Sequence, residues 1–381
     1  MSKLLFISNI SSRISSFAAS SVAAAHSLNL DFHQAANWQN TPKEQIEREE
    51  QVNQIKIYSV PISRNPLSKS NLAAYKEIVS LIEREKIDYI HCNTPVGGIL
   101  GRLAGKKCNV KRVIYQAHGF HFYRGAPLKN WLFYYPVEKL LARYTDALIT
   151  INREDYELAK SKLKPRNGGR VYYVPGVGID LEKFREPEAD RAVKRKELGI
   201  PENAVLLLSV GELNSNKNHE TVIRAIADLD VYYIIAGSGD LQPHLQDIID
   251  SLGLGSRVKL LGYRSDMKAL YDAADLFVFP SYREGLSISV MEAMASGLPC
   301  VASRIRGNTD LLEEAKGGLL CRPDDISGFA EKIQYLSSNH ELRKEMGCRN
   351  LSAIQNFSRE AVIRELCRIY DAEFSAKAIP R

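Results

Sequence analysis

The sequence predicts an α/β protein of two domains, each built around a parallel β-sheet with helices on both faces. Short apolar runs of strand length alternate with segments of helical periodicity along most of the chain, and this alternation is typical of doubly wound parallel sheets. A length of 381 residues suits two domains with separate cores, and 45% hydrophobic with 25% charged residues suits a soluble globular protein.

The strands expected in the first half are short and apolar, and helical patterns separate them. They cover residues 3–8, 55–60, 89–93, 112–117, 147–151 and 171–174, and an Ala-rich helix ends near Leu28. The loop before that helix, residues 8–16, lies at the edge where doubly wound sheets commonly bind ligands.

A domain boundary is expected after residues 171–180. There two Gly, a Pro and then a charged run replace the hydrophobic pattern. We therefore expect domains over 1–182 and 183–358, followed by a helix over 359–381. Strands expected in the second domain cover 204–210, 232–236, 258–261 and 276–279, and the alternation continues through 307–314 and 318–321.

Residues 276–301, LFVFPSYREGLSISVMEAMASGLPCV, contain the most informative pattern of the chain. A buried strand closes at Pro280, and Gly285 in the following turn allows the backbone to approach a ligand. A helix is expected from about Leu286 to Ala295, with Gly297 as its left-handed stop. Two carboxylates, Glu284 and Glu292, frame this helix.

Eight residues of helix separate the two carboxylates by about 12 Å, which approximates the distance from sugar to ribose in a nucleotide diphosphosugar. The backbone N–H groups of Gly285, Leu286 and Ser287, with the helix dipole, favour a diphosphate between them. The pattern thus predicts a clamp in which Glu284 binds sugar hydroxyls and Glu292 binds ribose hydroxyls. The alternative is an exposed helix that carries Glu for solubility alone.

This whole segment resembles the E-x7-E segment of the family 4 retaining glycosyltransferases. The resemblance covers nearly the whole chain and is strongest over residues 209–320. The strings HGFHFYRGAP, LITIN and GELNSNKNH look like the subgroup that acts in capsule and exopolysaccharide assembly, including EpsD-type proteins. It implies the GT-B fold, in which two Rossmann-like domains face a cleft and the C-terminal helix crosses back to the first domain. By this resemblance the first domain would bind the acceptor and the second the nucleotide sugar.

The resemblance also implies roles for further residues. His118 ends a strand and would face the donor sugar, although a single His is more often structural, and His121 is the rival candidate. Lys217, after Gly211, would bind the diphosphate, while Glu212 stands where the family usually has Arg. Tyr263 and Arg264 would lie near the nucleotide base.

The activity implied is retaining transfer of a sugar, possibly GlcNAc, from a UDP-linked donor to a lipid-linked saccharide. No protein nucleophile, cofactor or metal is expected, and Asp228 and Asp230 form a D-x-D that we interpret as a helix end. Two other classes stay open: a UDP-sugar epimerase of the same fold, and a nucleic-acid-binding protein, although no nucleic-acid recognition module is evident.

Charge and targeting bear on the cellular setting. Residues 1–190 hold 27 Lys and Arg against 19 Asp and Glu, so the first half carries +8 and the rest −2, which favours an anionic partner. From Arg102 to Arg143, nine basic residues interleave with aromatics against the single acid Glu138. This stretch, with Lys106, Lys107, Lys111 and Arg112, predicts either an ordinary core-packing helix or a surface that contacts the inner leaflet peripherally. The expected location is the cytoplasm. The six cysteines are scattered, no signal peptide is evident, and no apolar run is long enough to span a membrane.

Overall fold

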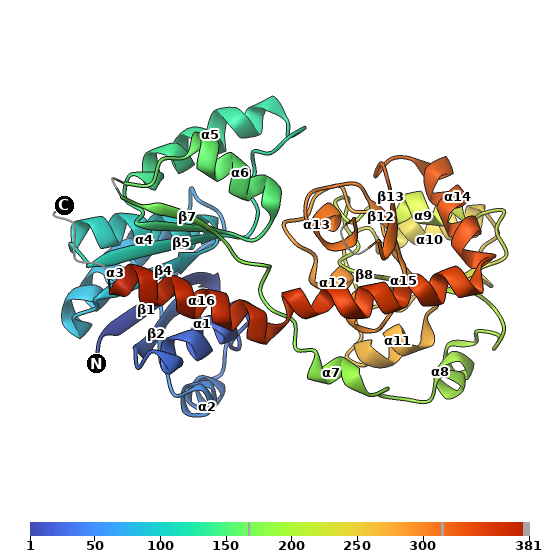
Figure 1. The fold of residues 1–381 in the computed structure, drawn as a ribbon, viewed down its shortest axis with the longest axis horizontal. Coiled ribbons are helices and arrows are strands. Elements are labelled where there is room, and N and C mark those ends of the chain that lie inside the picture. Colours follow the sequence, from blue (N-terminus) through green and yellow to red (C-terminus); the bar gives the residue numbers. More distant parts are fainter. Residues whose placement is uncertain (167, 314–315, 376–381) are drawn as a thin grey trace. The chain divides into compact units, whose positions relative to one another are not determined.

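The computed structural model describes residues 1–166, 168–313 and 316–375, and the chain divides into two compact units. Unit 1 holds Met1–Gly178 and the chain from Arg359 onward, and unit 2 holds Ile179–Ser358 (Figure 1). The first division falls after residue 178, earlier than the boundary at 182 expected from the sequence. The final helix belongs to unit 1, as expected for a helix that crosses back to the first domain.

Unit 1 is built on a seven-stranded sheet in which every neighbouring pair is parallel. Across the sheet the strands are β3 (Lys56–Ser59), β2 (Asp31–Asn37), β1 (Lys3–Ile10), β4 (Tyr89–Asn93), β5 (Arg112–Ala117), β6 (Ala147–Thr150) and β7 (Arg170–Tyr173). Its helices are α1 (Ser16–Ser27), α2 (Lys43–Asn53), α3 (Ser70–Glu85), α4 (Pro95–Lys107), α5 (Leu128–Ala142), α6 (Arg153–Lys162) and α16 (Arg359–Phe374).

Alternating side chains of the strands divide the core of unit 1 into two layers. On one face they pack with α3 and α4, and on the other with α1 and α16 (Figure 1). Helix α16 contributes Val362, Leu366, Ile369 and Tyr370 to the second layer. Gly178, at φ +83°, lies where an added Cβ would come within 2.7 Å of the Arg359 backbone, so only glycine fits this crossing.

Strand β2 was not expected from the sequence. Its residues DFHQAAN include His33 and Gln34, which are fully buried in the sheet. His33 contacts the Asp31 carboxylate at 3.0 Å and the Tyr58 hydroxyl at 3.2 Å. These tertiary partners satisfy polar groups that would otherwise be costly to bury.

Unit 2 has a six-stranded sheet whose neighbouring pairs are again all parallel. Across it run β10 (Val258–Leu260), β9 (Tyr232–Ala236), β8 (Leu206–Val210), β11 (Leu276–Phe279), β12 (Cys300–Ser303) and β13 (Gly318–Cys321). The helices are α7 (Glu182–Arg185), α8 (Arg191–Leu198), α9 (His219–Ala225), α10 (Gln242–Ser251), α11 (Met267–Ala273), α12 (Ile288–Ala295), α13 (Asn308–Leu312), α14 (Ile326–Ser337) and α15 (His340–Ala353), with a 3-10 turn η1 (Ile354–Phe357).

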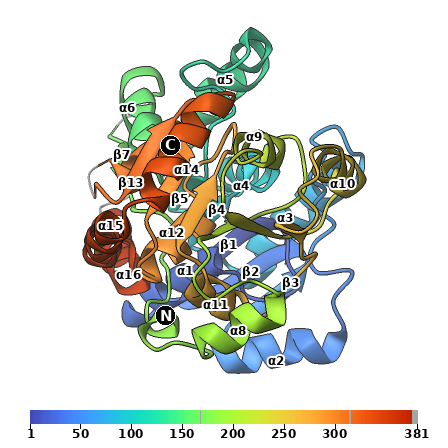
Figure 2. The same ribbon diagram turned by 90° about the vertical axis from the view of Figure 1, so that its right-hand side faces the viewer.

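Helices α9, α10 and α14 pack together on one face of this sheet, α11 and α12 lie on the other, and α15 contacts both α12 and α14 (Figures 1 and 2). Two helix-covered parallel sheets with a returning C-terminal helix confirm the fold class predicted from the sequence. Within the described residues, no helix combines the length and the apolar character needed to cross a membrane.

Candidate active site

The predicted donor-binding residues Lys217 and Glu284 come from loops at the carboxyl ends of adjacent strands, β8 and β11. Arg306, which was not predicted, follows the next strand, β12. Because the carboxyl ends of parallel strands share one edge of a sheet, the fold brings these loops together at the edge where α/β proteins bind ligands.

Lys217 and Glu284 form an ion pair. The Lys217 ammonium donates to Glu284 Oε1 at 2.7 Å, and each side chain is only about one-fifth exposed. The stem of Lys217 packs over Gly211, where an added Cβ would lie 3.2 Å from its carbons. The structure therefore places Gly211 beneath Lys217, with a small residue making room for the lysine.

Hydrogen bonds tie the loops around this pair to one another. Asn216 Nδ2 donates to the Arg283 carbonyl at 3.0 Å, and the Tyr282 N–H donates to the Asn216 carbonyl at 2.8 Å. Arg306 Nε donates to the Glu284 carbonyl at 3.2 Å. The backbone at Glu284 is therefore held from two sides, which positions its carboxylate. Glu212, at the position where Arg was expected from the family, is exposed and accepts from Asn214 Nδ2.

Helix α12 begins later than expected. Ser287 is its N-cap, because the Ser287 hydroxyl accepts from the Val290 N–H, and the first helical residue is Ile288 rather than Leu286. The N–H groups of Gly285 and Leu286 therefore belong to the loop, and that of Ser287 to the cap. They precede the positive end of the helix dipole, where an anion is still favoured.

Glu292 lies on α12, and its Oε2 accepts a hydrogen bond from the Tyr271 hydroxyl at 2.9 Å. Burial raises the pKa of Glu292, and the Tyr271 bond and the charge of Lys183 oppose that shift. The Tyr271 ring, from α11, is fully buried. In the part of the chain that the structure describes, Oε1 accepts no hydrogen bond, so one oxygen is fixed while the other is available to a hydroxyl ligand.

Tyr263 and Arg264 follow β10 and differ in availability. Tyr263 is 83% exposed. The Arg264 guanidinium binds both oxygens of Asp266, at 2.7 and 2.5 Å, and Glu197 at 3.2 Å. This pairing lowers the pKa of Asp266 and commits the Arg264 side chain, so Tyr263 is the more available of the two residues predicted to lie near the nucleotide base.

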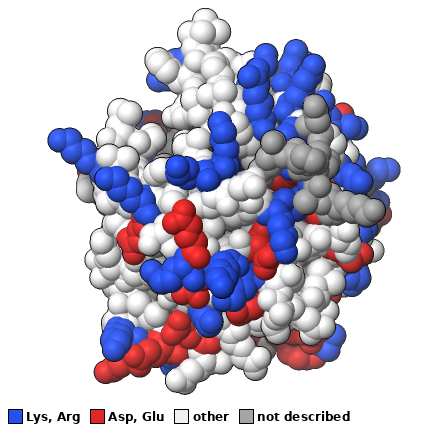
Figure 3. All heavy atoms as spheres, turned by 90° about the vertical axis from the view of Figure 1, so that its left-hand side faces the viewer, with Lys and Arg blue, Asp and Glu red and all other residues white. Residues whose placement is uncertain are grey.

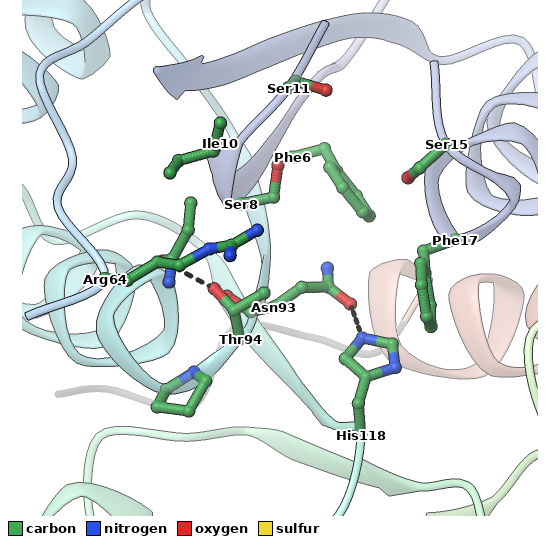
Figure 4. Close-up of a pocket in the computed structure, with 12 residues that line it drawn as sticks. Phe6, Ser8, Ile10, Ser11, Ser15, Phe17, Arg64, Asn93, Thr94 and His118 are labelled. Atoms are coloured by element: carbon green, nitrogen blue, oxygen red, sulfur yellow. Dashed lines mark hydrogen bonds between the residues drawn. The ribbon is translucent and has the colours of Figure 1, made fainter. Parts of the chain in front are cut away.

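In unit 1, His118 directly follows β5 and lines a cavity of about 500 Å³ (Figure 4). Its Nε2 contacts Asn93 Oδ1 at 2.8 Å, and its ring packs edge-on against Phe17 at 4.3 Å. Burial lowers the pKa of His118 to about 4, so the imidazole is neutral near pH 7. With Nε2–H donated to Asn93, Nδ1 is an acceptor. His121 instead stacks on Tyr134 of α5.

Sequence reasoning missed Tyr271 and Asn93, which fix Glu292 and His118. Asn93 could have been found from its position at the carboxyl end of a buried strand, whereas no local pattern in α11 marks Tyr271 as a partner of Glu292. Asp228 and Asp230 are exposed in the connection between α9 and β9. No cluster of three or more His, Cys, Asp or Glu suited to a metal ion occurs among the described residues.

Sequence comparisons match both units. Residues 190–350 match the family described as "Glycosyl transferases group 1", and residues 3–152 match "Glycosyl transferase 4-like". EpsD of Bacillus subtilis (strain 168), described as a glycosyltransferase, is 38% identical over 324 residues, 83% of this chain and 84% of that protein. The UDP-Gal:alpha-D-GlcNAc-diphosphoundecaprenol alpha-1,3-galactosyltransferase of Escherichia coli is 30% identical over 306 residues, 78% of this chain and 79% of that protein.

Solved structures share the fold at low sequence identity. Anabaena HepE, crystallised with UDP and glucose, has a TM-score of 0.79 at 20% identity and covers 98% of this chain and 100% of its own. The sucrose-phosphate synthase of Thermosynechococcus elongatus has a TM-score of 0.83 at 19% identity and covers 99% and 100%.

Proposed function

This chain belongs to the glycosyltransferases of the group 1, GT4-like family, and from that membership we propose that it moves a sugar from a UDP-linked donor to a lipid-linked saccharide, with retention of configuration, in exopolysaccharide or capsule assembly. The observation that carries the proposal is the Lys217–Glu284 ion pair in the loops before α12, together with the Glu292 carboxylate that Tyr271 fixes on that helix. A UDP donor is supported by HepE, crystallised with UDP. A lipid-diphosphate acceptor is supported by the name of the E. coli relative.

The proposed chemistry needs no protein nucleophile. Lys217 and the backbone amides of Gly285 to Ser287 stabilise the charge that develops on the leaving diphosphate. The leaving group takes the acceptor proton on the face from which it departs. In the structure the Lys217 charge is paired with Glu284, so a diphosphate that binds there competes for the ammonium, and sugar hydroxyls replace the ammonium at the carboxylate. Since a lysine supplies this charge, we propose that the reaction needs no metal.

Binding of nucleotide sugars gives the first test, because a ligand that binds the folded state stabilises it by about 2.7 kcal/mol at a hundredfold excess over Kd. Thermal unfolding is measured with UDP-GlcNAc, UDP-galactose and UDP-glucose, and with ADP-glucose and GDP-mannose as controls. We expect at least one UDP-sugar to raise Tm, with EDTA present, and the ADP and GDP compounds to leave it unchanged. A shift with duplex DNA and none with UDP-sugars would contradict the proposal.

A lipid-linked acceptor requires the protein to reach a bilayer, and α5 has the surface for it. Leu132 and Phe133 are 64% and 72% exposed, and Leu128, Tyr134, Val137 and Leu140 are exposed beside them. Large apolar patches that face solvent commonly mark membrane or protein contacts.

The side of α5 that faces the core of unit 1 is already packed against it. Trp131 and Tyr135 pack against the core, and Glu138 pairs with the fully buried Arg102 at 2.7 Å. The expectation that the aromatics are ordinary core is therefore correct for these two, and the outward row remains unexplained by packing within unit 1.

The charge around the row favours an anionic bilayer. Lys129, Lys139 and Arg143 are exposed on or next to α5, and Lys and Arg gather over the upper part of the face of unit 1 in Figure 3. Arg112, expected to take part in docking, does not: it is 5% exposed, bonds to the Glu373 carbonyl and pairs with Asp146. Lys111 pairs with Asp88 at 2.7 Å. We therefore place the membrane contact on α5.

Removing two apolar side chains from the row is expected to reduce vesicle binding by about 100-fold or more, because burial of each Leu or Phe contributes about 1.5 to 3 kcal/mol. The variant Leu132→Ser with Phe133→Ser is sedimented with phosphatidylglycerol vesicles. Leu67→Ser with Leu72→Ser, which are 90% and 64% exposed elsewhere in unit 1, is the matched control and should bind like wild type. Equal binding by both double variants would exclude α5 as the contact.

A further inference from the structure

The side chains that line the cavity beside His118 carry a net positive charge. The cavity lies at the carboxyl ends of β1, β4 and β5, and none of its lining residues is Asp or Glu. Arg64 contributes the only full charge among them, and Figure 4 shows its guanidinium directed toward the middle of the cavity. A cavity with a cation and no carboxylate attracts an anion.

Two helices of more than ten residues begin at this cavity. Ser15, the N-cap of α1, and Thr94, the N-cap of α4, both line it. Helix starts carry partial positive charge, which adds to that of Arg64. Asn9 Oδ1 accepts from the Gly97 N–H at 2.9 Å and from the Thr94 hydroxyl at 2.7 Å, so it fixes the start of α4 against β1.

A buried donor in the cavity has no partner among the described residues. Asn93 is 2% exposed; its Oδ1 contacts His118, and its Nδ2 makes no hydrogen bond. Leaving a buried donor unsatisfied costs about 1 to 3 kcal/mol, so an acceptor atom that reaches Nδ2 from the cavity would be favoured. In Figure 4 this nitrogen points away from His118 into the cavity.

The uncharged residues that line the cavity place a second requirement on the ligand. Phe6, Ile10 and Phe17 supply apolar surface, while Ser8, Ser11 and Ser15 supply hydroxyls. The ligand is therefore an anion rich in acceptor oxygens that is joined to a less polar part.

We propose that this cavity binds a diphosphate group through Arg64 and the Asn93 amide, and that in the reaction this is the diphosphate of the lipid-linked acceptor. The inference rests on the proposed function and adds which chemical group of the acceptor unit 1 recognises and with which residues. The donor also carries a diphosphate, so the experiment has one arm for each source.

Arg64→Gln removes the charge, and Arg13→Gln is the matched control, since Arg13 is exposed on the preceding β1–α1 loop and does not line the cavity. Arg64 is exposed, so both variants should unfold at the wild-type temperature. In the first arm, inorganic pyrophosphate is titrated calorimetrically into protein saturated with UDP. We expect wild type and Arg13→Gln to bind it, and Arg64→Gln to bind about 10- to 100-fold more weakly.

In the second arm UDP alone is titrated. If the cavity serves the acceptor, Arg64→Gln keeps wild-type UDP affinity. If it serves the donor, Arg64→Gln loses UDP affinity to a similar extent, and pyrophosphate no longer binds beside UDP. The first result supports the proposal, and the second keeps a diphosphate site but overturns its assignment to the acceptor. Wild-type behaviour of Arg64→Gln in both arms would overturn the inference, whereas failure of wild type to bind UDP would count against the proposed function itself.

Discussion

Replacement of Lys217 by alanine is expected to lower turnover by about 100- to 1000-fold, because it removes the side-chain charge that faces the leaving diphosphate. Glu212 occupies the position where the family usually has a second cation, and it is exposed. Steady-state rates with the best UDP-sugar measure the effect, in EDTA. Retention of most of the turnover would mean that the diphosphate is held some other way.

The Lys217–Glu284 ion pair calls for a double-mutant cycle, because Lys217→Ala also leaves Glu284 without its partner. UDP affinity is the suitable measurement, since Glu284→Ala should cut transfer while sparing UDP. If Lys217 touches the diphosphate, Lys217→Ala weakens UDP binding in both backgrounds, and by more in Glu284→Ala, where no carboxylate competes for the ammonium. A further variant, Glu212→Arg, restores the cation usual in the family and is expected to tighten UDP binding.

Glu292→Ala is expected to weaken UDP binding by about 10- to 100-fold, since a hydrogen bond to a charged group contributes about 1.5 to 3 kcal/mol. The loss should depend on the ribose hydroxyls. With 2′,3′-dideoxy-UDP, wild type and Glu292→Ala should therefore bind alike in calorimetry. An equal loss for both ligands would place Glu292 away from the ribose.

The pH dependence of UDP binding should report the same carboxylate. Burial raises the pKa of Glu292, and only the ionised form accepts from two hydroxyls. UDP affinity should therefore fall as pH drops through this raised pKa. Tyr271→Phe removes a bond that lowers the pKa, so its affinity should fall at a higher pH than that of wild type. Glu292→Gln should lack this dependence.

Buried parallel strands were the easiest elements to predict, because they are near-continuous apolar runs. Leu276–Phe279 and Arg112–Ala117 have the bounds expected from the sequence. Strand β2 was missed because His33 and Gln34 look like loop residues until neighbouring strands supply their partners. The start of α12 was misplaced because the Ser287 cap was not weighed against the helical pattern.

The residues of the candidate site also differ in how well the sequence predicts them. Glu284 and Glu292 share one short segment, so their spacing is visible in the sequence. Tyr271 is 21 residues from Glu292, and Asn93 is 25 residues from His118. Such pairs form only through tertiary packing, and no local pattern marks them.

The distribution of surface charge was the hardest property to predict from the sequence. Arg102 and Arg112 were counted with a basic surface, yet both are buried against carboxylates. The partners, Glu138 and Asp146, lie 36 and 34 residues away. A count of basic residues therefore overstated the basic surface, whereas the exposed apolar row of α5 appeared only in the fold.

The central claim, sugar transfer with retention to a lipid-linked acceptor, is tested most directly by one product analysis. The protein is incubated in EDTA with a carbon-13-labelled UDP-sugar and a short-chain polyprenyl-diphosphate GlcNAc, and the products are examined by NMR. The account predicts a labelled sugar on the lipid acceptor with the anomeric configuration that it had in the donor. An inverted linkage, or a donor converted to another UDP-sugar with no transfer to the acceptor, would contradict it.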